Sequence, residues 1–214
     1  MRSRRRLPLE KLAPYLLPDS DRGSLPTPIV WRQLFGNDNP VEIEVGFGKG
    51  LFLLSAATAN PGFNYFGIEI LRKYQLGTAT RLALQDRSNV KVACADARLL
   101  LRDRVADGSV QAMHVYFPDP WWKKKHHKRR LFTAEFAAVV ARVLMARGHF
   151  HIVSDVEEYF QVMMGIMAGL PVFQPAPPRM PTEGKHDLDY LTNFERKFRK
   201  EGRPIYRAAF VKSC

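Results

Sequence analysis

Residues 41–50 read Val41-Glu42-Ile43-Glu44-Val45-Gly46-Phe47-Gly48-Lys49-Gly50. The first five residues predict a short strand, and the glycine turn that follows predicts the opening of a helix. Glycines such as Gly46 and Gly48 allow a tight turn and a close approach of the backbone to a ligand. Because ligands of open α/β sheets bind outside the carboxyl ends of strands, this stretch predicts the first wall of a binding site.

Short apolar segments alternate with helical ones beyond this stretch. The predicted strands are 41–45, 65–68, 90–94, 110–117 and 149–153, and the predicted helices are 50–59, 72–85, 134–146 and 156–168. Such alternation is typical of parallel βαβ units, so we expect an α/β fold with a doubly wound sheet. A last strand, 205–211, follows a proline-rich loop at 175–181.

The first 40 residues are rich in proline, arginine and aspartate and show no sustained period. We interpret residues 1–40 as an irregular basic arm with one short helix around 10–17. Residues 41–214 then form a single domain, since neither a repeat nor a low-complexity segment divides them.

Charge and composition limit the classes of partner. Lysine and arginine number 33 against 21 aspartates and glutamates, which leaves a net charge of +12 and favours a polyanionic partner. The basic first residues resemble the start of a signal peptide, but Pro8, Glu10, Lys11 and Pro14 interrupt its apolar region. No apolar run is long enough to span a bilayer. Two cysteines are too few for a disulfide framework or a metal site. We therefore expect a cytoplasmic protein without a membrane or metal partner.

Three acids fall at the ends of successive predicted strands. Glu44 stands beside the glycine turn, Glu69 ends the second strand and Asp96 follows the third. Glu69 is placed to accept hydrogen bonds from ribose hydroxyls, and Asp96 to meet an adenine edge. Each acid taken alone is explained as well by a solvated loop or a helix N-cap. The glycine spacing, G-x-G-x-G, is one residue shorter than the dinucleotide fingerprint, so the set predicts an adenosyl site rather than an NAD site.

The segment after the fourth predicted strand combines rigid, aromatic and basic residues. Two prolines stiffen the turn around Asp119. Trp121 and Trp122 offer flat faces on which a base could stack. Six lysines and arginines follow between positions 123 and 130, with two histidines among them, and this pattern predicts contact with a polyphosphate chain.

These motifs resemble the tRNA (guanine-N7) methyltransferases, a family within the class I methyltransferases. The resemblance rests on Glu44-Val45-Gly46-Phe47-Gly48-Lys49-Gly50, on Gly67-Ile68-Glu69 and on Phe117-Pro118-Asp119-Pro120-Trp121 with its basic tail. It continues through Ser154-Asp155, Glu158-Tyr159 and Thr192-Asn193-Phe194-Glu195-Arg196-Lys197. The family implies a Rossmann-like sheet, mostly parallel with a C-terminal antiparallel strand. It also implies S-adenosylmethionine as cofactor, tRNA as substrate and guanine 46 of the variable loop as target.

The resemblance also implies a role for individual residues. The cofactor would be held by Glu44, Gly46, Gly48, Glu69, Asp96 and Asp119. The nucleotide would be bound by Lys123, Asp155, Thr192, Phe194 and Glu195. The RNA would be contacted by Lys125, His126, His127, Lys128, Arg129 and Arg130.

Other interpretations stay open for parts of this set. Ser154 with Glu157, and Thr192 with Glu195, each fit a helix capping box. Trp122 stands where the family usually has proline or histidine, and the residues before position 40 carry no motif that matches the family.

The chemistry itself requires no base, because N7 of guanine already carries a lone pair. We therefore assign Asp119 the role of orienting the guanine and balancing its growing positive charge. Three alternatives remain. One is a methyltransferase for an exocyclic amine of adenine or cytosine, which carries a similar Asp-Pro-Pro-aromatic turn. The others are a non-catalytic RNA-binding protein of the same fold and a nucleotide-dependent oxidoreductase, which the glycine spacing disfavours.

Overall fold

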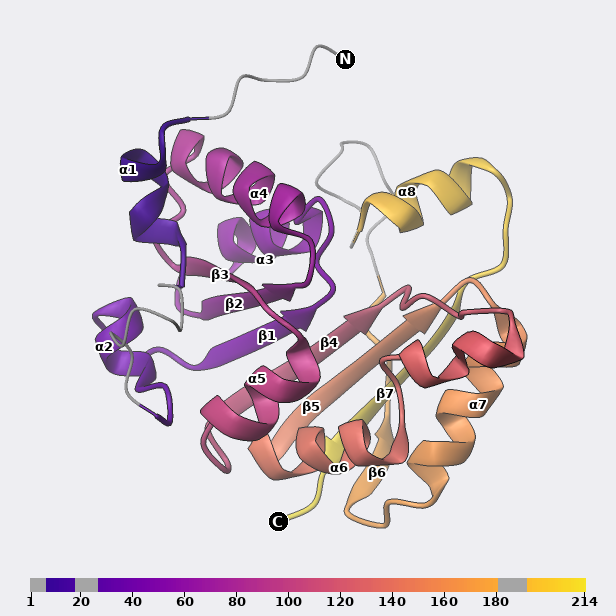
Figure 1. The fold of residues 1–214 in the computed structure, drawn as a ribbon. Coiled ribbons are helices and arrows are strands. Elements are labelled where there is room, and N and C mark those ends of the chain that lie inside the picture. The colour runs from indigo at the N-terminus through magenta and orange to yellow at the C-terminus, as the bar shows by residue number, and fades with distance from the viewer. Residues whose placement is uncertain (1–6, 18–26, 181–191) are drawn as a thin grey trace.

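The computed structural model describes residues 7–17, 27–180 and 192–214. A seven-stranded sheet runs through these residues in the order β3-β2-β1-β4-β5-β7-β6 (Figure 1). Its strands are β1 Val41–Val45, β2 Asn64–Glu69, β3 Val90–Cys94, β4 Val110–Tyr116, β5 Leu144–Ser154, β6 Phe173–Ala176 and β7 Tyr206–Lys212. The first five are parallel, while β7 pairs antiparallel with both β5 and β6. The predicted doubly wound sheet with an antiparallel C-terminal strand is confirmed.

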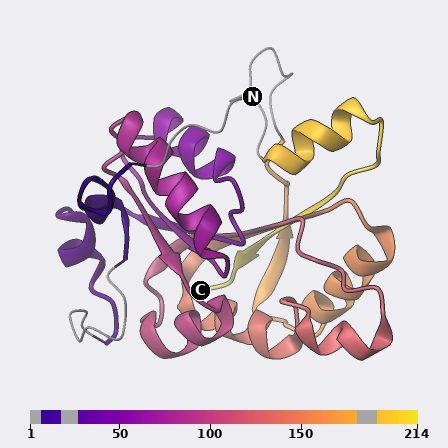
Figure 2. The same ribbon diagram turned by 45° about the horizontal axis from the view of Figure 1, so that its top comes forward.

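Helices cover both faces of the sheet (Figures 1 and 2). One face carries α3 Leu51–Ala59 and α4 Arg72–Leu84. The other carries α5 Ala97–Arg104, α6 Ala134–Val143 and α7 Glu157–Ala168. Every residue of β1 and β2 is buried as a result. Strands covered on both faces read as continuous rather than alternating apolar runs, which is why periodicity alone locates them poorly.

The helix predicted for 134–146 is too long, because α6 ends at Val143 and β5 begins at Leu144. The reason is tertiary: Leu144 is fully buried and pairs with Val110 across a bulge in the β4–β5 ladder. No element was predicted for α2 Trp31–Phe35, α5, α8 Asn193–Lys200 or β6. Strand β6 begins just before the predicted proline-rich loop. In α5, half of the eight residues are charged, so its apolar face is too narrow to be recognised from the sequence pattern.

The described part of the N-terminal arm packs against the sheet. It forms α1 Leu9–Leu12 and η1 Ala13–Tyr15, close to the predicted short helix, and both contact α4. Leu12 is fully buried, and the amide of Leu17 donates to the carbonyl of Val92 in β3 at 3.0 Å. The boundary at residue 40 stays a prediction.

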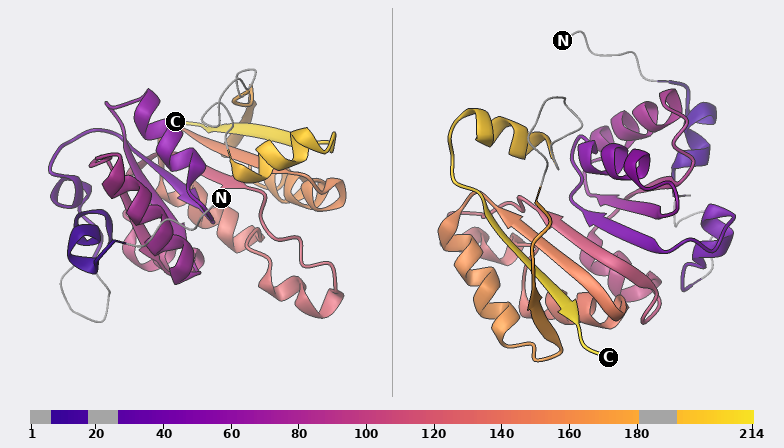
Figure 3. Two further views of the ribbon diagram at one scale, coloured as in Figure 1. Left: turned by 90° about the horizontal axis from the view of Figure 1, so that it is seen from above. Right: turned by 180° about the vertical axis from the view of Figure 1, so that it is seen from behind.

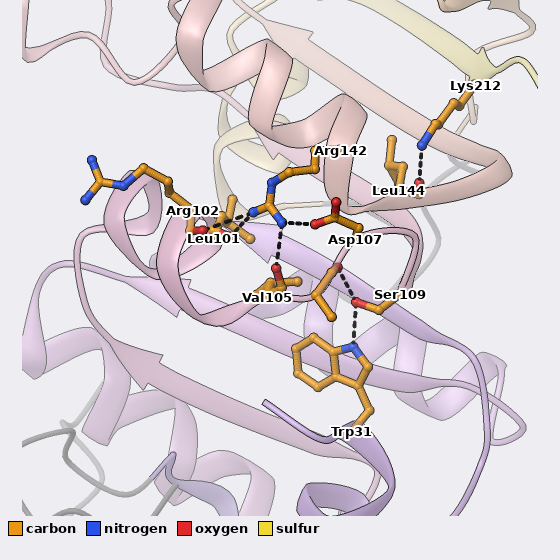
Figure 4. A network of polar contacts seen from close by, with 10 residues as sticks. Trp31, Leu101, Arg102, Val105, Asp107, Ser109, Arg142, Leu144 and Lys212 are labelled. Atoms are coloured by element: carbon orange, nitrogen blue, oxygen red, sulfur yellow. Dashed lines mark hydrogen bonds and ion pairs between the residues drawn. The ribbon is translucent and has the colours of Figure 1, made fainter. Parts of the chain in front are cut away.

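Arg142 joins α6 to the end of α5 (Figure 4). Its guanidinium donates to the carbonyls of Leu101 at 2.8 Å, Arg102 at 3.1 Å and Val105 at 3.0 Å, and it also pairs with Asp107. The last carbonyls of a helix have no partner within the helix. Arg142 therefore satisfies the carboxyl end of α5 and fixes the loop that leads into β4.

We expect Arg142→Met to lower the free energy of unfolding by about 2 kcal/mol, because it removes several charge-assisted hydrogen bonds at once. Denaturant unfolding measures the change. Arg32→Met is the matched control, since Arg32 forms only an exposed ion pair with Asp38 and should shift stability by less than about 0.5 kcal/mol. Equal effects of the two substitutions would contradict the bracing role of Arg142.

Candidate active site

The site lies where the strand order reverses, at the carboxyl ends of β1 and β4. Val45 at the end of β1 is in register with Ile68 of β2 on one side and with Val115 of β4 on the other. Glu69 is in register with Cys94 at the end of β3. The turns that follow these parallel strands therefore meet at one edge of the sheet, which is where open α/β sheets bind ligands.

The glycine turn between β1 and α3 is fixed by β2. The amide of Gly46 donates to the carbonyl of Ile68 at 2.8 Å, and the amide of Gly48 donates to Glu69 Oε2 at 3.0 Å. Gly50 has φ +65°, and a Cβ there would lie 2.4 Å from Thr78 Cγ2, so the turn requires glycine at this position. Glu69 Oε1 accepts from the amide of Leu71 at 3.0 Å, so both oxygens of its carboxylate are oriented.

Glu44 is a buried acid without a full set of partners. It is 2% exposed, and its Oε2 has no hydrogen-bond partner among the residues that the structure describes. Burial raises the pKa of Glu44 well above its usual value, and the neighbouring charge of Glu69 raises it further. A cation bound beside Glu44 would reverse both effects, since it would supply the missing partner of an ionised carboxylate.

Asp96 forms the N-cap of α5. It accepts hydrogen bonds from the backbone amide of Arg98 at 2.9 Å and from the Arg98 guanidinium at 2.7 and 3.1 Å. The side-chain bond from Arg98 is the main cause that lowers the pKa of Asp96. The capping interpretation of Asp96 is therefore confirmed, while a contact with adenine stays a prediction.

The turn after β4 has an unusual backbone. Phe117 has φ +53° and Trp121 has φ +46°, both in the left-handed region that non-glycine residues rarely adopt. Asp119 lies exposed between them. The amide of Phe117 donates to the carbonyl of Val153 at 2.8 Å, which ties the start of the turn to β5. Two unfavourable residues around an exposed acid mark this turn as a functional candidate.

The two tryptophans have different environments. The ring of Trp121 lies 5.7 Å from that of His126, and the guanidinium of Arg129 lies over it at 5.2 Å. Trp122 is 65% exposed and has no ring contact with the side chains that the structure describes. Of these two rings, that of Trp122 therefore has the less covered face for stacking on a base.

The basic segment forms the 3₁₀ helix η3, Lys124–Arg129, after this turn (Figure 3, left). Lys123, Lys125 and Arg129 are exposed, whereas Arg130 is half-buried. The side chains of Lys124, His127 and Lys128 lie outside the described part of the structure. The predicted RNA contacts therefore include exposed cations together with one arginine that is turned inward.

Helix α8 brings the predicted nucleotide-binding residues to the same edge. The ring of Phe194 is 52% exposed and lies 6.1 Å from that of Phe117, which also meets Phe198 at 5.4 Å. The Thr192 hydroxyl accepts from the Glu195 amide at 3.0 Å, so it caps α8 as its spacing allowed. Ser154 does not cap α7, whose N-cap is Val156. Its hydroxyl accepts from the Val156 amide instead.

The two predicted acids of the nucleotide pocket are held in ion pairs. Glu195 is fully buried and accepts from Arg207 at 2.5 Å and from Arg199 at 3.1 Å. Asp155, at the end of β5, pairs with Arg203 beyond α8. These three arginines were not predicted as partners, because arginines in a strongly basic chain are expected to lie on the surface. Arg207 fastens α8 to β7, and Arg203 fastens the segment after α8 to the end of β5, while the pair between Arg199 and Glu195 lies within α8.

A buried polar chain under the site was also not predicted. Tyr116 bonds to His114 Nδ1 at 2.9 Å, and His114 Nε2 bonds to Glu42 Oε2 at 2.9 Å. The ring of His151 stacks on His114 with centroids 5.0 Å apart. Burial lowers the pKa of both histidines, that of His151 to about 2, so the pair is neutral. Such residues are far apart in sequence and their spacing carries no motif.

Two classes of feature are absent from the part of the chain that the structure describes. No group of three or more His, Cys, Asp or Glu is arranged to hold a metal ion there. None of the helices within these ranges has the length and apolar character needed to cross a membrane. Neither Cys94 nor Cys214 forms a disulfide bond with the residues that the structure describes.

Comparison with known proteins places this geometry in a family. Residues 38–208 match a family described as "Putative methyltransferase". A tRNA (guanine-N(7)-)-methyltransferase of Rhodopirellula baltica is 44% identical over 194 residues, which are 88% of this chain and 72% of that protein. One of Actinobacillus pleuropneumoniae is 37% identical over 88% of this chain and 76% of that protein. Among solved structures, the 16S rRNA methyltransferase KamB has a TM-score of 0.61 at 16% identity, covering 86% of this chain and 93% of that one, which is a likeness of fold.

The raised pKa of Glu44 predicts how stability depends on pH. At low pH the Glu44 carboxyl is protonated in both the folded and the unfolded chain. As pH rises above the usual pKa of glutamate, the unfolded chain ionises first, so the folded state loses stability until pH passes the raised pKa of Glu44. We therefore expect Glu44→Gln to leave stability unchanged near pH 4 and to raise the melting temperature of the ligand-free protein at pH 8. Glu10→Gln, at an exposed position, should show no such growing difference. A Glu44→Gln variant less stable than wild type at pH 8 would contradict this electrostatic account.

Proposed function

The chain belongs to the family of tRNA (guanine-N(7)-)-methyltransferases, and we propose that it methylates N7 of the guanine at position 46 in the variable loop of tRNA. The enzyme transfers the methyl group of S-adenosylmethionine to guanine N7 in tRNA. The observation that carries this conclusion is the 44% identity over 194 residues, a range long enough to include the whole sheet edge described above. The choice of nucleotide 46 is the part that depends on resemblance alone.

The residues at the glycine turn fit S-adenosylmethionine, which carries positive charge on its amino acid portion and two ribose hydroxyls. Glu44 offers a buried carboxylate oxygen without a partner among the described residues, where a cationic group would be stabilised. Glu69 is held with both oxygens oriented and retains lone pairs for hydroxyl donors. Gly46, Gly48 and the cap residue Asp96 complete the set that would hold the cofactor.

Catalysis in this proposal is mainly a matter of positioning. The bound cofactor supplies an electrophilic methyl group on a sulfonium, and guanine N7 supplies the lone pair, so no general base is needed. Asp119 orients the guanine and balances the positive charge that grows on it. Its position in a turn with two left-handed residues supports this role, because residues in such unfavourable backbone conformations cluster at active sites.

The guanine is received between the Asp119 turn and α8. Phe194 presents an exposed aromatic face beside Phe117, which suits stacking on a purine. Lys123, the partly exposed Asp155 and the buried Glu195 bind the nucleotide in this proposal, and Thr192 fixes the start of α8. The ion pairs of Glu195 support a second duty for it, which is to hold α8 over the site.

The tRNA backbone is contacted by the exposed cations of the basic segment, among them Lys125 and Arg129. Because its substrate is tRNA, we assign the enzyme to the cytoplasm.

Methyl transfer from labelled S-adenosylmethionine to unmodified tRNA, followed by borohydride and aniline cleavage, tests the function directly. A single cleavage in the variable loop is expected. Label without cleavage would assign the methyl group to an exocyclic amine instead. Tight tRNA binding without label would leave a non-catalytic RNA-binding protein.

Asp119→Asn should lower kcat at saturating tRNA by about 10²-fold, the scale observed when one preorganised electrostatic contact is removed. The carboxamide has the same size but no charge, so tRNA affinity should not change. Single-turnover kinetics and filter binding measure the two quantities separately. Near-normal turnover would rule out charge balancing by Asp119.

Trp122→Ala should weaken tRNA binding by about tenfold, because stacking of one base on an aromatic side chain contributes roughly 1–3 kcal/mol. Its exposed ring makes no packing contribution, so the melting temperature should stay that of wild type. Trp122→Phe is the matched control and should retain most of the affinity. Unchanged binding by the alanine variant would show that Trp122 meets no base.

A further inference from the structure

Arg130 differs from the other cations of the basic segment. Lys125 and Arg129 are exposed, but the side chain of Arg130 turns back toward the Asp119 turn. Its Nε donates to the carbonyl of Pro120 at 2.7 Å, and its guanidinium lies 4.8 Å from the centre of the Tyr159 ring. A guanidinium engaged in this way has less of its surface available for an RNA phosphate.

The contact of Arg130 falls at the point where the turn needs support. Phe117 and Trp121 both adopt left-handed φ values, which are unfavourable for residues that carry a Cβ. The hydrogen bond from the Phe117 amide to the Val153 carbonyl holds the first end of the turn. The carbonyl of Pro120 precedes Trp121 directly, so the bond from Arg130 holds the second end. Asp119 lies between these two anchors.

The aromatic ring that Arg130 contacts is buried. Tyr159 in α7 is 1% exposed, and its hydroxyl accepts from the amide of Phe132 at 3.4 Å. Burial raises the pKa of Tyr159, while the charge of Arg130 lowers it and that of Asp119 raises it. The ring therefore lies buried beneath the guanidinium that also donates to the carbonyl of Pro120, the residue after Asp119.

We propose that Arg130 is a positioning residue of the methyl transfer, which clamps the Pro118–Trp121 turn so that Asp119 faces the guanine. This assignment rests on the proposed function and replaces, for this residue, the sequence prediction of an RNA contact. Arginine suits the task because its planar group can stack on Tyr159 while Nε donates in the plane. Lysine keeps the charge but cannot do both.

The substitutions Arg130→Lys and Arg130→Met, with Lys125→Met for contrast, test the assignment. Both Arg130 variants should lose about 100-fold in kcat, the scale expected for a misplaced catalytic group. Their Kd for tRNA and its dependence on salt should match wild type. Lys125→Met should instead raise Kd and reduce the slope of log K against log salt by about one.

Hydrogen exchange provides a readout that does not depend on catalysis. In Arg130→Lys the amides of Phe117, Asp119, Trp121 and Trp122 should exchange faster than in wild type, while those of α7 stay protected. This arm still tests the clamp if the wild-type enzyme fails to methylate tRNA at N7, which would refute the proposed function alone. A thermal melt confirms that each variant folds, and Arg130→Lys serves if Arg130→Met does not.

Two results would overturn the proposal. Wild-type kcat in Arg130→Lys would mean that only the charge matters. A flattened salt dependence with normal kcat in Arg130→Met would make Arg130 a phosphate contact like its neighbours.

Discussion

The parallel pairing of β1 with β2 on one side and β4 on the other is the constraint on which the site depends. It brings the glycine turn, Glu69 and the Asp119 turn to one edge of the sheet, although they lie far apart in sequence. The chain then crosses from one face of the sheet to the other, so the edge between β1 and β4 stays uncovered by connecting helices. A different strand order would separate the residues proposed to hold the cofactor from Asp119, which is proposed to meet the guanine.

Charge is divided across this edge. The acids Glu44 and Glu69 lie on the cofactor side, where the burial of Glu44 is unfavourable for the ligand-free protein. The exposed cations of η3 lie on the other side of the Asp119 turn. A positively charged methyl donor and a polyanionic acceptor are thus attracted to opposite sides of one reacting centre. The two ends of the strained turn between them are tied to β5 and to Arg130 by hydrogen bonds.

Helix α8 closes the edge from the antiparallel part of the sheet. Ion pairs from Arg207, Arg199 and Arg203 fix it through Glu195 and Asp155, and the Phe117–Phe198 contact packs it on the turn. The acids that the motifs marked as substrate contacts are therefore also structural. A helix fastened mainly by charged pairs can respond to a bound nucleotide more readily than one embedded in an apolar core.

The sequence by itself determined the sheet class, the glycine turn and the set of chemical groups at the site, because hydrophobic periodicity and turn chemistry are local properties. It did not determine where α6 ends, since burial of Leu144 beside Val110 overrides helical propensity. It could not separate Trp121 from Trp122, or Arg130 from Arg129, because neighbours of one residue type differ only in what the fold places beside them. The contacts with Tyr159 and Pro120 distinguish Arg130 from Arg129. The pairing of Arg207 and the Glu42–His114–Tyr116 chain were likewise not predicted, because such partners leave no trace in sequence spacing. Only the tertiary structure, by bringing distant residues into contact, decided which of the predicted groups are paired within the fold and which stay exposed.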